Sequence, residues 1–300
     1  RSIRVEVTQL EETEERDWLQ TRMESTGNHL ELTRERQLHI LAKLTEAEVF
    51  EQFVHGSYGA GTKRFSLEGG DALIPLIGRL EYALIPTLVR TPGVPSNDLI
   101  PSLLTTSDVL GTGWFAADAA NVKPGSTVVV VGDGAVGLLG VLSAKQMGAE
   151  RIIAMSRHEE RQKLAREFGA TDIVTERGDE GTTQINELTN GIGADSVLEC
   201  VGTQESMMQA ILATRPGGSV GYVGVPHGVL LDGEKLFYSH VHLHGGPAPV
   251  RRYLPKLIDL VLDREINPGK VFDLTLPLDQ VAEGYRAMDE RRAIKTLLRP

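Results

Sequence analysis

The hydrophobic pattern of the chain is most regular after residue 126, where short apolar runs alternate with amphipathic stretches. The first run, Thr127–Val131, is too apolar for a strand with one face in water. Apolar runs separated by helical stretches predict βαβ units and a parallel sheet. The predicted strands are Thr127–Val131, Ile152–Met155, Asp172–Val174, Ser196–Cys200, Ser219–Val223 and Val241–Leu243, with helices near 159–168, 182–189 and 204–213.

Six such strands with right-handed crossovers make a doubly wound α/β fold of the Rossmann type. Residues 1–50 have a different pattern, with many charges around few apolar side chains, and they predict two or three amphipathic helices. The expected elements after the sheet are helices over 250–263 and 278–289, and strands Val271–Leu274 and Ala293–Leu298.

Three glycines follow the first predicted strand with the spacing G-x-G-x-x-G, in the segment Gly132-Asp-Gly-Ala-Val-Gly137. A strand before them and a helix after them is the context in which this motif binds a dinucleotide. Gly132 makes the tight turn, Gly134 lets the backbone approach a pyrophosphate, and Gly137 lets the helix pack on the strand. The free N–H groups around Ala135 and Val136 then face the phosphates. The alternative is an ordinary strand–turn–helix.

Ser156 ends the second predicted strand, where dinucleotide-binding folds usually carry Asp or Glu on the ribose 2′-hydroxyl. A small hydroxyl leaves room for a 2′-phosphate, which the forked guanidinium of Arg157 can bind. We therefore favour NADP(H) over NAD(H). Two alternatives stay open. Ser156 and Glu159 have the spacing of a helix capping box, and Glu159 or Glu160 could reach the ribose instead.

Composition narrows the class of protein further. The formal charge of −10 and the pI near 5.4 argue against nucleic acid as the main partner. The single cysteine, Cys200, excludes an intrachain disulfide framework and fits the cytoplasm. No run of eighteen apolar residues and no signal-peptide pattern is present, so we expect no membrane partner.

The segment FEQFVHGSYGAGTKRFSLEGGDALIPLI, residues 50–77, resembles the thiamine-dependent first component of 2-oxoglutarate dehydrogenase. The resemblance covers about residues 1–77 and stops before that family's cofactor-binding core. No thiamine diphosphate motif follows it.

From residue 81 onward the chain resembles the medium-chain, zinc-dependent alcohol dehydrogenases. The match runs through TVVVVGDGAVGLLG, ADSVLECVG, RPGGSVGYVGV and RAIKTLLRP. The resemblance implies hydride transfer between NADP(H) and a small alcohol or carbonyl compound, with a cofactor-binding module lacking catalysis as the alternative. The N-terminal half of that family's catalytic (GroES-like) domain is absent, so the second domain is expected to be incomplete.

The two resemblances together predict an apparent chimera joined near residues 78–80. The expected parts are a helical segment (1–77), a linker with a remnant of the catalytic domain (78–122), the Rossmann domain (123–248) and a C-terminal return to the catalytic domain (249–300).

The alcohol dehydrogenase resemblance implies further cofactor contacts at the crevice. Thr112, in LGTGW, matches a threonine beside the nicotinamide, and Lys295 stands where many relatives have an arginine that reaches the pyrophosphate. The loops expected around the nicotinamide ribose and carboxamide contain Cys200, Val201, Gly202, Val223, Gly224 and Val225. For each of these the alternative is ordinary turn packing.

A catalytic zinc needs three protein ligands and one open position. The resemblance places Asp108, in SDVLGTG, at the third ligand position. The expected partners, an early cysteine and a histidine in a Gly-His-Glu stretch, are absent, and His39 and His55 belong to the other segment. We therefore expect Asp108 to be a helix N-cap, zinc not to be bound, and the alcohol dehydrogenase activity to be impaired by the missing ligands. No catalytic residue is assigned.

Three alternating histidines, His240, His242 and His244, would share one face of the sixth strand. Such a set superficially suggests a metal site. The resembled family pairs subunits along this strand, so we expect a structural or homodimer-interface role instead.

Overall fold

A computed structural model of the protein describes residues 30–32, 65–67, 89, 91 and 93–299. The chain divides into two compact units, residues 1–90 and 91–300. In the first unit β1 (Leu30–Leu32) and β2 (Phe65–Leu67) pair in parallel, a contact that the sequence did not predict. The helices expected in residues 1–50 lie outside the described residues.

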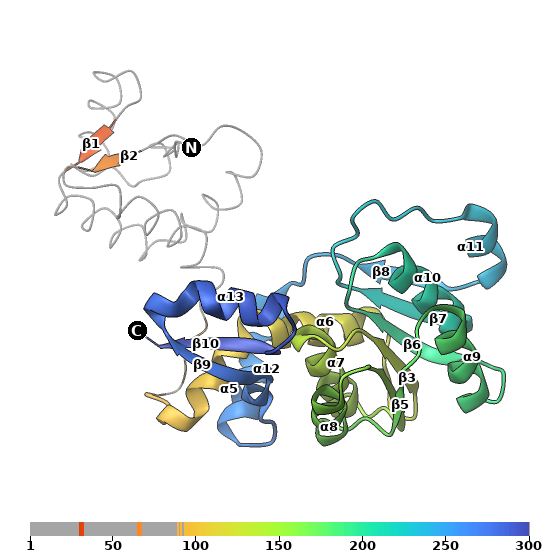
Figure 1. Ribbon diagram of the computed structural model, residues 1–300, viewed down its shortest axis with the longest axis horizontal. Coiled ribbons are helices and arrows are strands. Elements are labelled where there is room, and N and C mark those ends of the chain that lie inside the picture. The colour runs from red at the N-terminus through yellow and green to blue at the C-terminus, as the bar shows by residue number, and fades with distance from the viewer. Residues whose placement is uncertain (1–29, 33–64, 68–88, 90, 92, 300) are drawn as a thin grey trace, which may run out of the picture. The chain divides into compact units, whose positions relative to one another are not determined.

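The second unit is built on a parallel six-stranded sheet with the order β5-β4-β3-β6-β7-β8 (Figure 1). The chain starts in the middle of the sheet and moves outward in both directions, as in a Rossmann fold. The predicted fold class is confirmed. The strands are β3 (Thr127–Val131), β4 (Arg151–Met155), β5 (Asp172–Val174), β6 (Ala194–Glu199), β7 (Thr214–Tyr222) and β8 (His242–Gly245).

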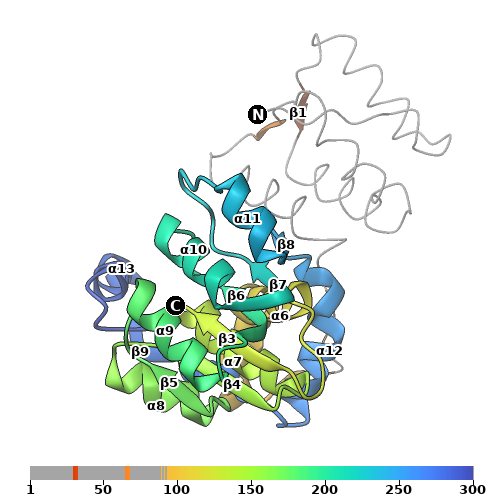
Figure 2. The same cartoon turned by 90° about the vertical axis from the view of Figure 1, so that its right-hand side faces the viewer.

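Helices cover both faces of this sheet because successive strand residues point to opposite sides. Val128 and Val130 of β3 pack in one apolar cluster with α6 (Val109–Ala119), α7 (Ala135–Gln146) and α8 (Glu159–Glu167). Val129 and Val131 pack in a second cluster with α9 (Gly178–Leu188) and α10 (Gln204–Ala213). Figure 2 shows α9 and α10 on one side of the sheet and α6 on the other. Each buried valine contributes about 1.5–3 kcal/mol.

Small residues bring α6 close to its neighbours. A Cβ on Gly113 would lie 2.7 Å from the Gly140 nitrogen of α7. A Cβ on Gly221 of β7 would collide with the Ala116 carbonyl oxygen. The helix that carries Thr112 is therefore fixed against the sheet beside the glycine loop, which is the part of the fold that matters for the site.

The C-terminal elements agree with the predicted order. The strands β9 (Phe272–Pro277) and β10 (Lys295–Arg299) pair in parallel, and α13 (Val281–Asp289) packs on them. The remaining elements are η2 (Asn97–Leu99), α5 (Ile100–Thr106), α11 (Gly233–Ser239), α12 (Val250–Leu262), η3 (Pro268–Val271) and η4 (Leu278–Gln280). None of the described helices is long and apolar enough to cross a membrane.

The histidine prediction is partly wrong. His242 and His244 lie on β8, two residues apart and both exposed. His240 ends α11 in a left-handed conformation, with φ +53°, and is not on the strand. The His244 ring packs edge-to-face on Phe115, at 6.0 Å between centroids. A homodimer through β8 stays a prediction.

Candidate cofactor site

The glycine loop follows β3, which neighbours β6 in the sheet (Figure 1). The strand order reverses between these two strands, because the chain continues outward from β3 on one side and from β6 on the other. In doubly wound sheets ligands bind in the crevice at this reversal. Gly132 has a φ of +116°, which glycine adopts at no steric cost. A Cβ on Gly137 would collide with the Gly132 carbonyl oxygen, whereas a Cβ on Gly134 would meet nothing within 4 Å. The backbone at Gly134 is thus open to a ligand.

The start of α7 offers unpaired donors to that ligand. Gly134 is the N-cap residue, and the Leu138 N–H donates the first intrahelical bond back to its carbonyl at 3.0 Å. The earlier N–H groups, including those of Ala135 and Val136, have no intrahelical acceptor. No acidic side chain lies in the first turn. Free N–H groups and the helix dipole together attract an anion such as a pyrophosphate.

Two neighbouring loops extend the same surface. A Cβ on Gly202 would collide with the Val225 carbonyl, and a Cβ on Gly224 would collide with the Gly202 nitrogen. The Val201 side chain reaches the glycine loop, because a Cβ on Gly132 would lie 2.8 Å from Val201 Cγ2. The loops after β3, β6 and β7, which the sequence assigned to one cofactor, therefore lie side by side.

Glu199 holds two of these loops and was missed in the sequence. Its fully buried carboxylate accepts hydrogen bonds through Oε1 from the N–H groups of Val201 (2.9 Å) and Gly202 (2.8 Å). Its backbone carbonyl accepts from the N–H of Val223 at 2.9 Å. A single acidic residue at the end of an apolar strand was the signal that could have identified it.

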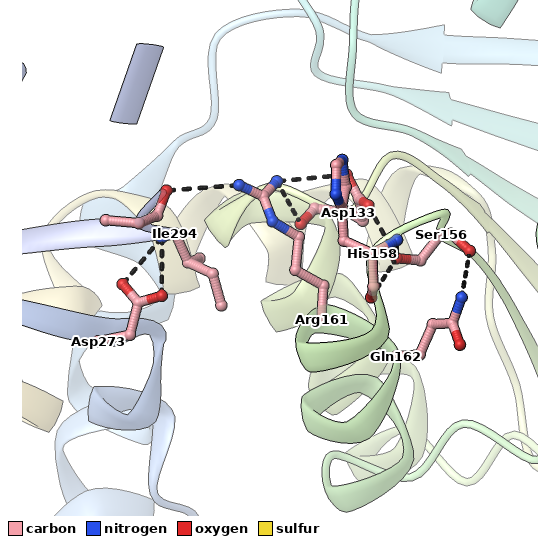
Figure 3. Close-up of polar contacts among 8 residues, drawn as sticks. Asp133, Ser156, His158, Arg161, Gln162, Asp273 and Ile294 are labelled. Carbon is pink, nitrogen blue, oxygen red and sulfur yellow. Dashed lines mark hydrogen bonds and ion pairs between the residues drawn. The ribbon is translucent and has the colours of Figure 1, made fainter. Parts of the chain in front are cut away.

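Ser156 directly follows β4, beside the glycine loop, and the capping-box hypothesis is wrong for it. The N-cap residue of α8 is His158, two positions later, so Glu159 cannot close the box. Ser156 is instead buried and donates a hydrogen bond from its hydroxyl to Asp133 Oδ2 at 2.8 Å (Figure 3). Arg157 is exposed and thus accessible to a ligand.

Asp133 and Arg161 form a buried ion pair that the sequence analysis did not predict. Arg161 Nη1 lies 3.3 Å from Asp133 Oδ1 and also donates to the Asp133 carbonyl at 3.2 Å (Figure 3). Arg161 Nη2 donates to the Ala293 carbonyl at 3.3 Å. The two charges come from the glycine loop and α8, 28 residues apart in sequence. No local pattern signals such a contact.

Asp108 occupies the N-cap position of α6, as predicted, but its side chain makes no capping hydrogen bond. Its carboxylate is largely exposed and lies 3.9 Å from Lys295 Nζ. Thr112 donates its hydroxyl to the Asp108 backbone carbonyl at 2.8 Å. Thr112 and Lys295, both expected at the cofactor, thus lie near two different groups of Asp108, its backbone carbonyl and its carboxylate.

The residues around Asp108 do not fit a zinc ion. The described part of the chain has no group of three or more His, Cys, Asp or Glu side chains that could hold a metal. The neighbour of the Asp108 carboxylate is a cation, Lys295, rather than a second ligand. His39 and His55 lie outside the described residues. The expectation that the protein does not bind zinc stays a prediction.

The strand order and the glycine loop at its switch point define a Rossmann-type domain. Residues 135–263 match the family model of zinc-binding dehydrogenases. The relatives described next agree with this match, and together they support the medium-chain, zinc-type alcohol dehydrogenase family for the part of the chain that they align with. The resemblance of residues 1–77 to a thiamine-dependent enzyme stays a prediction.

The relatives are all alcohol dehydrogenases, and each aligns with about two thirds of this chain. A probable zinc-binding alcohol dehydrogenase of Mycobacterium tuberculosis is 37% identical over 212 residues, which are 69% of this chain and 54% of the relative. An NADP-dependent isopropanol dehydrogenase of Thermoanaerobacter brockii is 31% identical over 69% of this chain and 60% of its own. The solved alcohol dehydrogenase of Thermus sp. ATN1 superposes with a TM-score of 0.62 at 28% identity, over 66% of this chain and 60% of that one. The chain spans a little over half the length of the first of these relatives.

Proposed function

We propose that this protein binds NADP(H) at the crevice between β3 and β6 and transfers hydride between it and a small alcohol or carbonyl compound. The observation that carries the proposal is the end of β4. A buried serine, Ser156, stands there in place of a carboxylate, and the exposed guanidinium of Arg157 follows it. Relatives named as NADP-dependent isopropanol dehydrogenases support the same cofactor.

The loops supply the other parts of a dinucleotide site. The N–H groups at the start of α7 bind the pyrophosphate, and the loops tied by Glu199 line the nicotinamide end. Lys295, whose Nζ lies 3.9 Å from Asp108 Oδ2, is assigned to the pyrophosphate by the family resemblance alone. None of these contacts identifies a substrate, so the proposed substrate class rests on the family alone.

Calorimetric titration of NADPH and NADH tests the cofactor. We expect NADPH to bind about 10- to 100-fold more tightly, because charge-assisted hydrogen bonds from Arg157 to the 2′-phosphate contribute roughly 1.5–3 kcal/mol. Arg157→Ala should remove most of this difference. Arg166→Ala, which removes an exposed arginine from the far end of α8, is the matched control. Equal affinities for the two cofactors, or no effect of Arg157→Ala, would contradict the proposal.

A cofactor-binding module without turnover is the second candidate. The pairing of Asp108 with Lys295, and the lack of a metal-ligand cluster in the described part of the chain, favour it. Metal analysis and alcohol-dependent NADPH formation separate the two candidates. One tightly bound zinc per chain together with NADPH formation from alcohols supports the enzyme. Cofactor binding without zinc and without turnover supports the module.

A further inference from the structure

The Asp133–Arg161 ion pair is buried beside the phosphate loop of the candidate cofactor site. An unpaired charge at this position would strongly affect the binding of an anionic cofactor. Asp133 is 6% exposed and Arg161 is 8% exposed. Asp133 lies between the first two glycines of the phosphate loop. An unpaired carboxylate there would oppose any anion bound by the loop, since burial reduces the screening by water.

The position of Asp133 makes this effect specific to one end of the cofactor. Its Oδ2 accepts the hydroxyl hydrogen of Ser156 at 2.8 Å (Figure 3). Ser156 stands where Rossmann folds recognise the 2′ position of the adenine ribose. A 2′-phosphate bound there carries charge of the same sign as the Asp133 carboxylate. A 2′-hydroxyl, in contrast, can donate a hydrogen bond to a carboxylate.

We propose that Arg161 is a specificity-determining residue that favours NADP(H) by neutralising Asp133. This inference rests on the proposed binding of NADP(H). Arg161 acts through Asp133 and is too buried to receive the phosphate itself, which falls to Arg157. With Arg161 paired, the carboxylate orients Ser156 without repelling the 2′-phosphate. Without it, the same carboxylate would favour a free 2′-hydroxyl.

The contacts of Arg161 keep its guanidinium on Asp133. It donates to the side chain and the backbone carbonyl of Asp133, and its other nitrogen donates to Ala293. The chain after Ala293 is fixed in turn, because the Ile294 N–H donates to the Asp273 carboxylate at 2.8 Å (Figure 3). The guanidinium is therefore held between the phosphate loop and the segment that leads to Lys295.

The test is the ratio of NADPH to NADH affinity, measured by calorimetry on the full chain. Arg161→Gln should weaken NADPH binding about 10- to 100-fold and NADH binding by a clearly smaller factor, since both cofactors carry the pyrophosphate but only NADPH adds a 2′-phosphate beside the Asp133–Ser156 contact. Asp133→Asn should hold the ratio at or above the wild-type value, because Arg161 is then unopposed. The double variant Arg161→Gln/Asp133→Asn, which has neither charge, should recover most of the preference for NADPH that Arg161→Gln loses.

Controls separate this role from a structural one. Arg166→Gln removes an exposed arginine of the same helix and should leave the ratio unchanged. Arg161→Lys keeps the positive charge and should keep most of the preference. Thermal unfolding is followed for every variant, because breaking a buried pair costs stability. If Arg161→Gln does not fold, Asp133→Asn and the double variant still test the ratio.

The affinity ratios of the variants show whether Arg161 determines the cofactor preference. Equal weakening of both cofactors by Arg161→Gln would assign Arg161 a structural role and overturn the inference. So would an unchanged ratio in that variant, or a fall in the ratio for Asp133→Asn. A wild-type protein with no preference for NADPH would overturn both the proposed cofactor and this inference, whereas a wild-type preference that survives Arg161→Gln overturns the inference alone.

Discussion

The Glu199 carboxylate accepts a hydrogen bond from the Gly202 N–H at 2.8 Å, and this contact fixes a loop of the candidate site. The same oxygen also accepts from Val201 N–H and from the Ser206 hydroxyl at 2.7 Å. Three donors thus converge on one buried carboxyl oxygen, whereas the other oxygen, Oε2, has no hydrogen-bond partner among the described residues. The loop conformation therefore depends on this single buried acceptor.

We expect Glu199→Ala to weaken cofactor binding at least about tenfold and to lower the free energy of unfolding by about 2–4 kcal/mol, because three buried donors lose their acceptor. Glu199→Gln keeps an acceptor oxygen and should cost less on both measures. Calorimetry and denaturant unfolding check this. Wild-type cofactor affinity in Glu199→Ala would show that the loop does not depend on the carboxylate.

The glycines of the phosphate loop should separate stability from binding. Gly137→Ala should lower the free energy of unfolding by several kcal/mol, since the new Cβ collides with the Gly132 carbonyl. Gly134→Ala meets nothing within 4 Å at a φ of −75°, and should change stability by less than about 1 kcal/mol while weakening cofactor binding. Denaturant unfolding and calorimetry on both variants check the contrast. Equal loss of stability in the two would contradict these roles.

The sheet could be predicted because its signals are local. Thr127 and four consecutive valines define β3, and the predicted strand Thr127–Val131 has the ends that the structure gives it. The strand predicted at Ser219–Val223 begins earlier in the structure, at Thr214, and its pairing with β6 is irregular between Thr214 and Ser219, where Gly217 has a φ of +76°. Propensity is a weak guide at such an irregular strand start.

The polar network of the site could not be predicted in the same way. The pattern S-x-x-E at Ser156 suggested a capping box, but α8 begins two residues too late for it. The burial of Arg161 and Asp133 depends on how α8 packs against the glycine loop, which no spacing reveals. Glu199 was within reach, since a lone acid at the end of an apolar strand needs a buried partner.

The pair Arg151–Asp172 should make stability depend on pH. The guanidinium donates to both carboxylate oxygens at 2.9 Å, and these bonds hold the pKa of Asp172 below its usual value. A lowered folded-state pKa adds stability above the unfolded pKa of about 3.9, and that stability is lost as the pH falls below it. Both side chains are partly exposed, so we expect Asp172→Asn to cost only about 1 kcal/mol at pH 7.

The measurement is denaturant unfolding of wild type and Asp172→Asn between pH 3 and pH 8. The difference between them should be constant above about pH 5 and shrink below about pH 4. Asp263→Asn, which changes an exposed carboxylate at the end of α12, controls for the loss of one charge. A difference that grows as the pH falls would have the wrong sign for this pair.

The thiol of Cys200 should react slowly in the folded protein. It is the only cysteine in the chain, and it follows Glu199 at the end of β6. Burial and the Glu199 charge raise its pKa well above the usual range. Alkylating reagents attack the thiolate, which is then scarce at pH 8. We expect iodoacetamide to modify native Cys200 at least about tenfold more slowly than the unfolded chain.

The Glu199→Gln variant separates the two causes of that slow reaction. Removing the neighbouring negative charge should speed alkylation part of the way toward the unfolded rate, while burial continues to protect the thiol. Mass spectrometry of timed samples, with denatured protein as the reference, measures both rates. Native alkylation as fast as that of the denatured chain would show a freely ionising thiol. The half-buried position of Cys200 next to Glu199 would then give its thiol no protection.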